Sequence, residues 1–159
     1  MTQATTPTPA ATVAPPHPLL QRFMTELRAP ALDGETFDAW AHAPGHALVF
    51  FSEDPAQHRE TLDVAVIVPE LAKAFPARFR TALLPPAAAK ALSVRYGFRR
   101  WPAIVLLKDG QYVGAIDGLR DWDVYCAELG RLLETEPNRP PSIGIAVKSA
   151  DPGGASHCN

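Results

Sequence analysis

The sequence predicts an α/β fold, in which helices flank a central mixed sheet that closes with a β-hairpin and a C-terminal helix. Three observations predict it. Short apolar segments typical of buried strands alternate with segments of helical periodicity. Residues 103–116 resemble two strands joined by a tight turn, and residues 122–133 carry one apolar stripe. With 159 residues, of which 47% are hydrophobic, the chain can bury the core of one such domain.

Both ends of the chain lack this patterning. Residues 1–17 are rich in Ala, Thr and Pro, and such a composition buries too little apolar surface to offset the entropy cost of ordering. Residues 137–159 are similarly polar and rich in Pro and Gly. We therefore expect a disordered N-terminal tail at 1–17, one domain at 18–136 and a flexible C-terminal tail at 137–159.

The first half of the domain begins with helical periodicity and leads into a buried strand. Apolar residues recur at helical spacing from 19 to 27 and predict a first helix. Thr36 is a candidate N-cap for a second helix that Pro44-Gly45 stops. We expect a short strand near Ala31-Leu32, and "ALVFF" at 47–51 predicts a strand buried on both faces.

The second half continues the alternation. "VIVPELAKAF" at 66–75 predicts a helix with Pro69 at its first turn or at a kink. A strand is expected at 79–84, and a helix at 86–97 that closes with Gly97. After Pro102, "AIVLL" and "YVGAI" flank Asp109-Gly110, which is a hairpin signature.

The last helix has the clearest periodicity. Asp121 is a candidate cap, and the apolar positions that follow predict a single buried stripe. These positions are Trp122, Tyr125, Cys126, Leu129, Leu132 and Leu133.

Composition argues against several classes of protein. The formal net charge of −2 gives no indication of nucleic-acid binding, and no apolar run reaches the length of a membrane span. The N-terminus lacks the basic start and apolar stretch of a secretory signal, so we expect a cytoplasmic protein without membrane insertion. The two cysteines, Cys126 and Cys158, form no CxxC motif, and Cys126 is expected to be a buried, inert thiol.

The order of elements, the proline that opens the penultimate strand and the Lys-Asp-Gly turn resemble thioredoxin. In that family the corresponding proline is cis, and two catalytic cysteines follow the first buried strand. Here the bond is Trp101-Pro102. Both stretches that match the cysteine pair, 56–59 and 61–64, are free of cysteine.

A closer resemblance, over residues 32 to 134, is to the hydrogenase-expression family HyaE/HupG/HoxO. It rests on Ser52, Asp54-Pro55, Glu70-Leu71, Phe75-Pro76, Gly97-Phe98, the Pro102 strand, and Gly118 followed by Trp122. The resemblance implies a thioredoxin-like fold without redox cysteines and without a cofactor. It also implies a non-enzymatic chaperone for an uptake nickel–iron hydrogenase. The implied partner is the small-subunit precursor, which carries a twin-arginine signal peptide; other hydrogenase maturation proteins are further candidates.

Two loops hold the candidate partner-binding residues. In the acidic loop, residues 52–60, Glu53 and Asp54 could meet the paired arginines of a signal peptide. The alternative is a solvated loop in which Asp54-Pro55 starts a turn, and a metal site formed with His58 is a weaker interpretation. No metal ligand set is predicted.

The proline loop, residues 99–102, is the second candidate. Trp101 could anchor an extended peptide bound by strand addition beside Pro102, or it could simply pack on the core. Arg99 and Arg100 would repel signal-peptide arginines and would instead suit an acidic surface of the precursor. Sequence alone does not decide between the two.

Two other classes of function stay open. A thiol oxidoreductase would use Cys126 or Cys158 as a lone reactive thiol. A redox-inactive thioredoxin-like domain could also act as a general peptide-binding scaffold.

Overall fold

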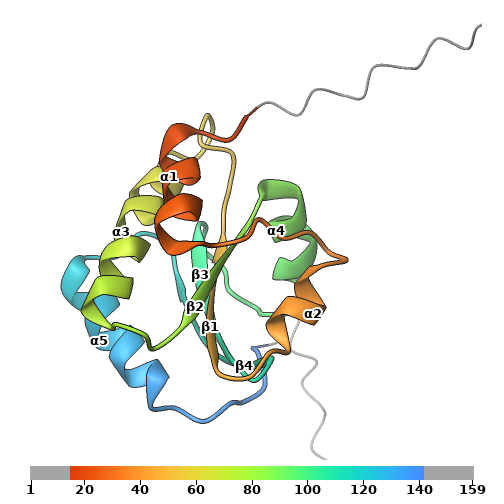
Figure 1. The fold of residues 1–159 in the computed structure, drawn as a ribbon, viewed down its shortest axis with the longest axis vertical. Coiled ribbons are helices and arrows are strands. Elements are labelled where there is room, and N and C mark those ends of the chain that lie inside the picture. Colours follow the sequence, from red (N-terminus) through yellow and green to blue (C-terminus); the bar gives the residue numbers. More distant parts are fainter. Residues whose placement is uncertain (1–14, 142–159) are drawn as a thin grey trace, which may run out of the picture.

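In the computed structural model, which describes residues 15–141, helices cover both faces of a four-stranded sheet (Figure 1). The elements are α1 (Pro18–Leu27), α2 (Phe37–Ala41), β1 (His46–Phe51), α3 (Glu60–Ala74), β2 (Arg80–Leu84), α4 (Pro86–Ser93), β3 (Ala103–Lys108), β4 (Gln111–Asp117) and α5 (Trp122–Leu133). The strand order is β2-β1-β3-β4, with β1 parallel to β2 and with the other two pairs antiparallel. The predicted α/β fold with a mixed sheet, closing hairpin and C-terminal helix is confirmed.

Strand β1 separates two hydrophobic layers, because successive side chains of a strand point to opposite faces of the sheet. Leu48 and Phe50 pack with residues of α1, α3 and α5. Val49 and Phe51 pack with residues of α2 and α4. Figure 1 shows these two groups of helices on opposite sides of the sheet. The central place of β1 puts the loop that follows it in the middle of one end of the sheet.

The hairpin between β3 and β4 turns as predicted. Asp109 and Gly110 have φ angles of 52° and 81°, and positive φ at both central residues is what a type I′ turn requires. Asp109 also accepts the Gly45 N–H through Oδ1 at 2.7 Å and donates its own N–H to the Gly45 carbonyl at 3.0 Å. The turn is thereby tied to the start of β1.

The strand expected near Ala31-Leu32 is only a single parallel bridge between Ala31 and Leu83. Two hydrogen bonds of 2.9 Å form it, from the Leu32 N–H to the Leu83 carbonyl and from the Leu83 N–H to the Pro30 carbonyl. Pro30 itself has no N–H to extend the ladder. The sheet within the described residues therefore has four strands rather than five.

Two helices differ in length from their predictions. Helix α3 starts at Glu60, several residues earlier than expected, so Pro69 lies inside it. Helix α4 ends at Ser93 rather than near Gly97. After it, Arg95 and Tyr96 donate to carbonyls three residues earlier, and this tighter winding brings Tyr96 into the core on the α2/α4 face.

Of the predicted C-terminal tail, only residues 137–141 are described, and Asn138 among them is hydrogen-bonded to β4. Asn138 donates its N–H to the Tyr112 carbonyl at 2.8 Å and its side-chain amide to the Val113 carbonyl at 2.9 Å. It thereby covers part of the outer edge of β4. Residues 1–14 and 142–159 of the predicted tails, Cys158 included, lie outside the described residues. Within 15–141, no helix has the length and apolar character that spanning a bilayer needs.

Candidate functional site

One row of paired residues brings the two candidate loops to the same end of the sheet. Phe51, the last residue of β1, pairs with Leu84 of β2 and with Ala103 of β3. Ala103 in turn pairs with Asp117, the last residue of β4. The acidic loop after β1, the turn after β2, the proline loop before β3 and the loop after β4 therefore all lie at this end.

The acidic loop is anchored at its start and shaped by Asp54. The buried Ser52 donates its hydroxyl to the Leu84 carbonyl at 2.6 Å. The Asp54 carboxylate accepts the Ala56 N–H at 2.9 Å, and the Asp54 carbonyl accepts the His58 N–H at 2.8 Å. Asp54 is exposed and takes part in no ion pair among residues 15–141. Its charge is thus open to a partner.

Glu53 differs from Asp54 because it already has a partner. Its carboxylate lies 2.8 Å from His58 Nε2, and its N–H donates to the Thr61 hydroxyl at 3.2 Å. The pairing holds Glu53 against the loop and leaves it half-buried. In the described part of the chain, no three His, Cys, Asp or Glu residues come together as a group that could hold a metal ion.

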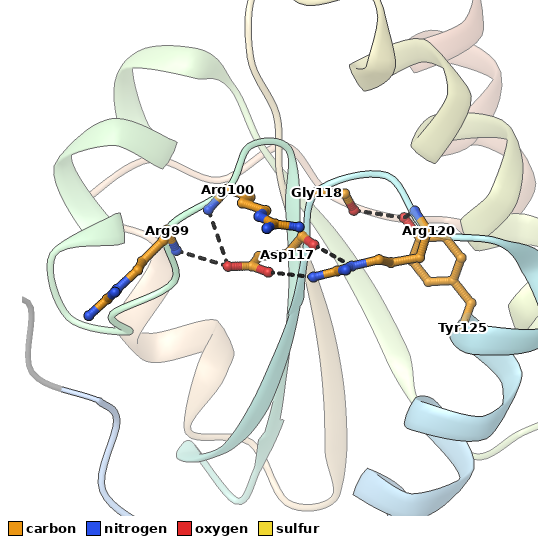
Figure 2. A network of polar contacts seen from close by, with 6 residues as sticks. All are labelled: Arg99, Arg100, Asp117, Gly118, Arg120 and Tyr125. Atoms are coloured by element: carbon orange, nitrogen blue, oxygen red, sulfur yellow. Dashed lines mark hydrogen bonds and ion pairs between the residues drawn. The ribbon is translucent and has the colours of Figure 1, made fainter.

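The proline loop is held in place by a carboxylate at the end of β4. The Trp101-Pro102 peptide bond is cis, like the corresponding bond in the thioredoxin family. Asp117 accepts the main-chain N–H groups of Arg99 at 2.9 Å and of Arg100 at 3.1 Å, both through Oδ2 (Figure 2). The Gly118 N–H donates to the Pro102 carbonyl at 2.8 Å. Two consecutive residues of β4 and its loop therefore fix the shape of the proline loop.

Arg120 completes the environment of Asp117. Its guanidinium lies 3.2 Å from Asp117 Oδ1 and donates through Nε to the Asp117 carbonyl at 3.0 Å. Partial burial of Asp117 raises the pKa of its carboxyl group. The hydrogen bonds from Arg99 and Arg100 and the ion pair with Arg120 outweigh this effect, so the net pKa is below its ordinary value. Asp117 is consequently ionised at neutral pH.

Tyr125 of α5 joins the same network. Its hydroxyl donates to the Gly118 carbonyl at 3.0 Å and accepts the Arg120 N–H at 3.3 Å (Figure 2). The side chain is 1% exposed, so these groups have little access to water. The sequence placed Tyr125 in the apolar stripe and did not reveal the polar role of its hydroxyl. Asp117 was also missed, because nothing in its local sequence distinguishes it from any strand-end aspartate.

Trp101 both packs on the core and remains half-exposed. Its ring lies edge-to-face against Phe98 and Phe51, with ring centroids 5.0 Å and 6.4 Å apart. Pro102 is buried. These contacts hold the Trp101 side chain in place at this end of the sheet.

Arg99 and Arg100 are exposed, and neither is in an ion pair within residues 15–141. Figure 2 shows the Arg99 side chain directed away from Asp117. The Arg100 side chain lies over Gly118, where an added Cβ would be 3.2 Å from the Arg100 Cβ. The proline loop therefore presents two unpaired positive charges.

The predicted stripe of α5 is wrong at its first position. Tyr125, Leu129, Leu132 and Leu133 are buried, but Trp122 is 44% exposed. Trp122 is the first residue of α5, and the predicted cap residue Asp121 makes no side-chain capping bond. Leu119, beside Gly118, is equally exposed at 44%. These two apolar side chains extend the exposed surface next to the proline loop.

The stretches that match the thioredoxin cysteines lie just before α3, at 56–59, and in its first turns, at 61–64. Cys126 is on α5, where it is partly buried against the core. Cys126 was predicted to be buried, but in the structure it is only partly buried. No thiol among residues 15–141 lies in the acidic or proline loop.

Comparison with known proteins agrees with this architecture. The family model described as "Hydrogenase-1 expression protein HyaE" matches residues 19–125. The chain belongs to this family. It is 38% identical over 153 residues to the hydrogenase expression/formation protein HoxO of Cupriavidus necator, covering 95% of this chain and 94% of that protein. It is 31% identical over 141 residues to the hydrogenase expression/formation protein HupG of Rhizobium leguminosarum bv. viciae, covering 86% and 91%.

A solved structure supports the fold of this HyaE-family member. The N21Q mutant of thioredoxin from Halobacterium salinarum matches with a TM-score of 0.55 and 25% identity, over 70% of this chain and 96% of the thioredoxin. The thioredoxin-like fold and the family inferred from the sequence are therefore both confirmed. Membership places the protein among the factors of hydrogenase expression and formation.

Proposed function

We propose that this protein is a non-catalytic chaperone that binds the small-subunit precursor of a nickel–iron hydrogenase before export. The proposal rests on the end of the sheet at which the acidic loop and the proline loop lie. It keeps the rigid proline loop of a thioredoxin-like fold, and its loops contain no cysteine within the described residues. Recognition of an extended segment is thus retained without covalent trapping.

The proline loop supports peptide binding through its main chain. Asp117 occupies the N–H groups of Arg99 and Arg100. No hydrogen bond within residues 15–141 engages the main-chain N–H or C=O of Trp101. A client segment in extended conformation could pair with these two groups, as in strand addition, while the half-exposed Trp101 ring contacts its side chains.

The absence of thiols from these loops also suits the client. Cysteines of the precursor must bind iron–sulfur clusters, and thiol–disulfide exchange with a chaperone would compete with cluster binding. A lone-thiol oxidoreductase would need an accessible thiolate, whereas Cys126 is partly buried on α5. The cytoplasm, where the precursor is made, is the proposed location.

Affinity capture tests the proposal. Tagged full-length protein is expressed with the small-subunit precursor, with and without its signal peptide. We expect capture of the precursor, reduced when the signal peptide is deleted. Asp54→Asn and the double variant R99A/R100A report which loop contributes, with Asp123→Asn and Arg139→Ala as exposed controls outside both loops. Failure of the folded wild-type protein to capture either form of the precursor would overturn the proposal.

A further inference from the structure

An apolar groove of about 670 Å³ adjoins the acidic loop on the β2 side of the sheet end. Its walls come from four segments: residues 15–17 together with Leu20 and Met24 of α1, the bridge residue Ala31, the acidic loop with Pro55, and the end of β2 with Leu83 and the two prolines that follow it. The volume lies within the range of about 300–1,000 Å³ that is usual for binding sites in proteins.

The charge at the groove is negative. Asp54 lies in the lining, and no Lys or Arg does. His17, the other titratable residue of the lining, accepts the Leu19 N–H through Nδ1 at 3.1 Å and so caps α1. One oxygen of the Asp54 carboxylate accepts the Ala56 N–H, and the other has no partner among residues 15–141. The groove therefore combines apolar walls with one unpaired carboxylate.

We propose that this groove holds the apolar stretch of the client's signal peptide, with a neighbouring arginine bound to Asp54. Export signals have a basic start followed by an apolar stretch, which is the combination that this lining complements. An acidic segment would be repelled by Asp54. A wholly apolar segment would leave the Asp54 carboxylate without a partner and partly desolvated. The inference rests on the proposed function and assigns a position to the client.

A signal peptide bound in this groove would also avoid repulsion by Arg99 and Arg100. The groove is lined by residues at the ends of β1 and β2, whereas the proline loop precedes β3, on the other half of the sheet. None of residues 99–102 lines the groove. Signal-peptide arginines at Asp54 thus occupy a different surface from the two arginines of the proline loop, which are left to contact an acidic region of the same precursor.

Calorimetric titration of full-length protein with synthetic peptides tests this position. The probe peptide carries two arginines followed by the apolar stretch of a small-subunit signal. One control peptide has serines in place of the apolar residues, and another has glutamines in place of the arginines. We expect each control peptide to bind at least about tenfold more weakly than the probe.

Variants of the protein locate the binding. Met24→Gln places a polar group in the groove wall, and Ala56→Arg adds a cation to the exposed part of the acidic loop. Both are expected to weaken probe binding about tenfold, as is Asp54→Asn. Val94→Gln is the matched control, because Val94 is 72% exposed and does not line the groove. Ala56→Arg keeps the test valid if Met24→Gln does not fold.

The outcomes separate this inference from the proposed function. Undiminished probe binding by all three folded variants, together with normal capture of the precursor, overturns the groove assignment and leaves the chaperone function standing. Wild-type protein that binds neither probe nor precursor overturns both. Self-association that the same variants abolish in sedimentation experiments would assign the groove to a second copy of the chain, which also overturns the inference.

Discussion

The carboxylate of Asp117 accepts the main-chain N–H of Arg99, with 2.9 Å between Oδ2 and the nitrogen. The two residues are 18 positions apart and meet because β3 and β4 are antiparallel, so that the end of β4 lies beside the segment preceding β3. Through this contact the sheet determines the shape of the proposed peptide-binding loop.

Asp117→Asn should destabilise the protein by about 1–3 kcal/mol, because a neutral amide replaces a carboxylate that accepts two N–H groups and pairs with Arg120. Urea denaturation measures the loss. The amide protons of Arg99 and Arg100 should also exchange faster with deuterium. Asp123→Asn, on the exposed first turn of α5, is the control. A loss no greater than that of the control would contradict the role assigned to Asp117.

The same carboxylate predicts a pH dependence. The folded-state pKa of Asp117 is below its ordinary value of 3.8. The stability that its charge supplies is therefore fully present above that value and is lost as the pH falls through the lower folded-state pKa. The difference in unfolding free energy between wild type and Asp117→Asn should be constant from pH 7 to 5 and should narrow below about pH 4. If the difference in unfolding free energy stays constant down to pH 2, an interaction other than the charge of Asp117 causes that difference.

Tyr125→Phe should cost about 1–3 kcal/mol, since the Gly118 carbonyl and the Arg120 N–H lose their shared partner in a buried environment. The control is Tyr112→Phe, because the Tyr112 hydroxyl makes no hydrogen bond within the described residues while its ring stacks on Tyr96. Thermal unfolding of both variants checks the prediction. Equal stabilities of the two variants would mean that the Tyr125 hydroxyl adds nothing.

Gly118→Ala should destabilise the protein by about 1–2 kcal/mol, because Gly118 has a φ of 71° and its added Cβ would crowd Arg100. Gly34→Ala is the matched control, with no atom within 4 Å of the added Cβ. We expect the control to unfold at the same denaturant concentration as wild type, or slightly higher. Equal stabilities of Gly118→Ala and Gly34→Ala would mean that the proline loop does not restrain the backbone at Gly118.

Cys126→Ser should leave capture of the small-subunit precursor unchanged, because the proposed binding involves no thiol chemistry. Wild-type protein treated with a thiol-blocking reagent should behave in the same way. Capture lost by a folded Cys126→Ser protein would favour the lone-thiol alternative over the proposed chaperone function.

Local patterns were sufficient to predict most of the fold. The apolar run of β1, the Asp109-Gly110 turn and the periodicity of α1 and α5 have short-range causes, namely burial on two faces, positive φ and one buried helix face. The same kind of reading located the acidic loop and the proline loop, since each borders a recognisable strand. The motifs that indicated the family lie within these segments.

Only the tertiary structure decided how those parts work together. It paired Glu53 with His58 but left Asp54 free, exposed Trp122, and brought Asp117 and Tyr125 to the proline loop. It also formed the groove from α1, the acidic loop and the end of β2. Periodicity records which face of an element is buried, but hydrogen bonds and cavities depend on which distant segments the sheet register sets side by side, and no short stretch of sequence contains that information.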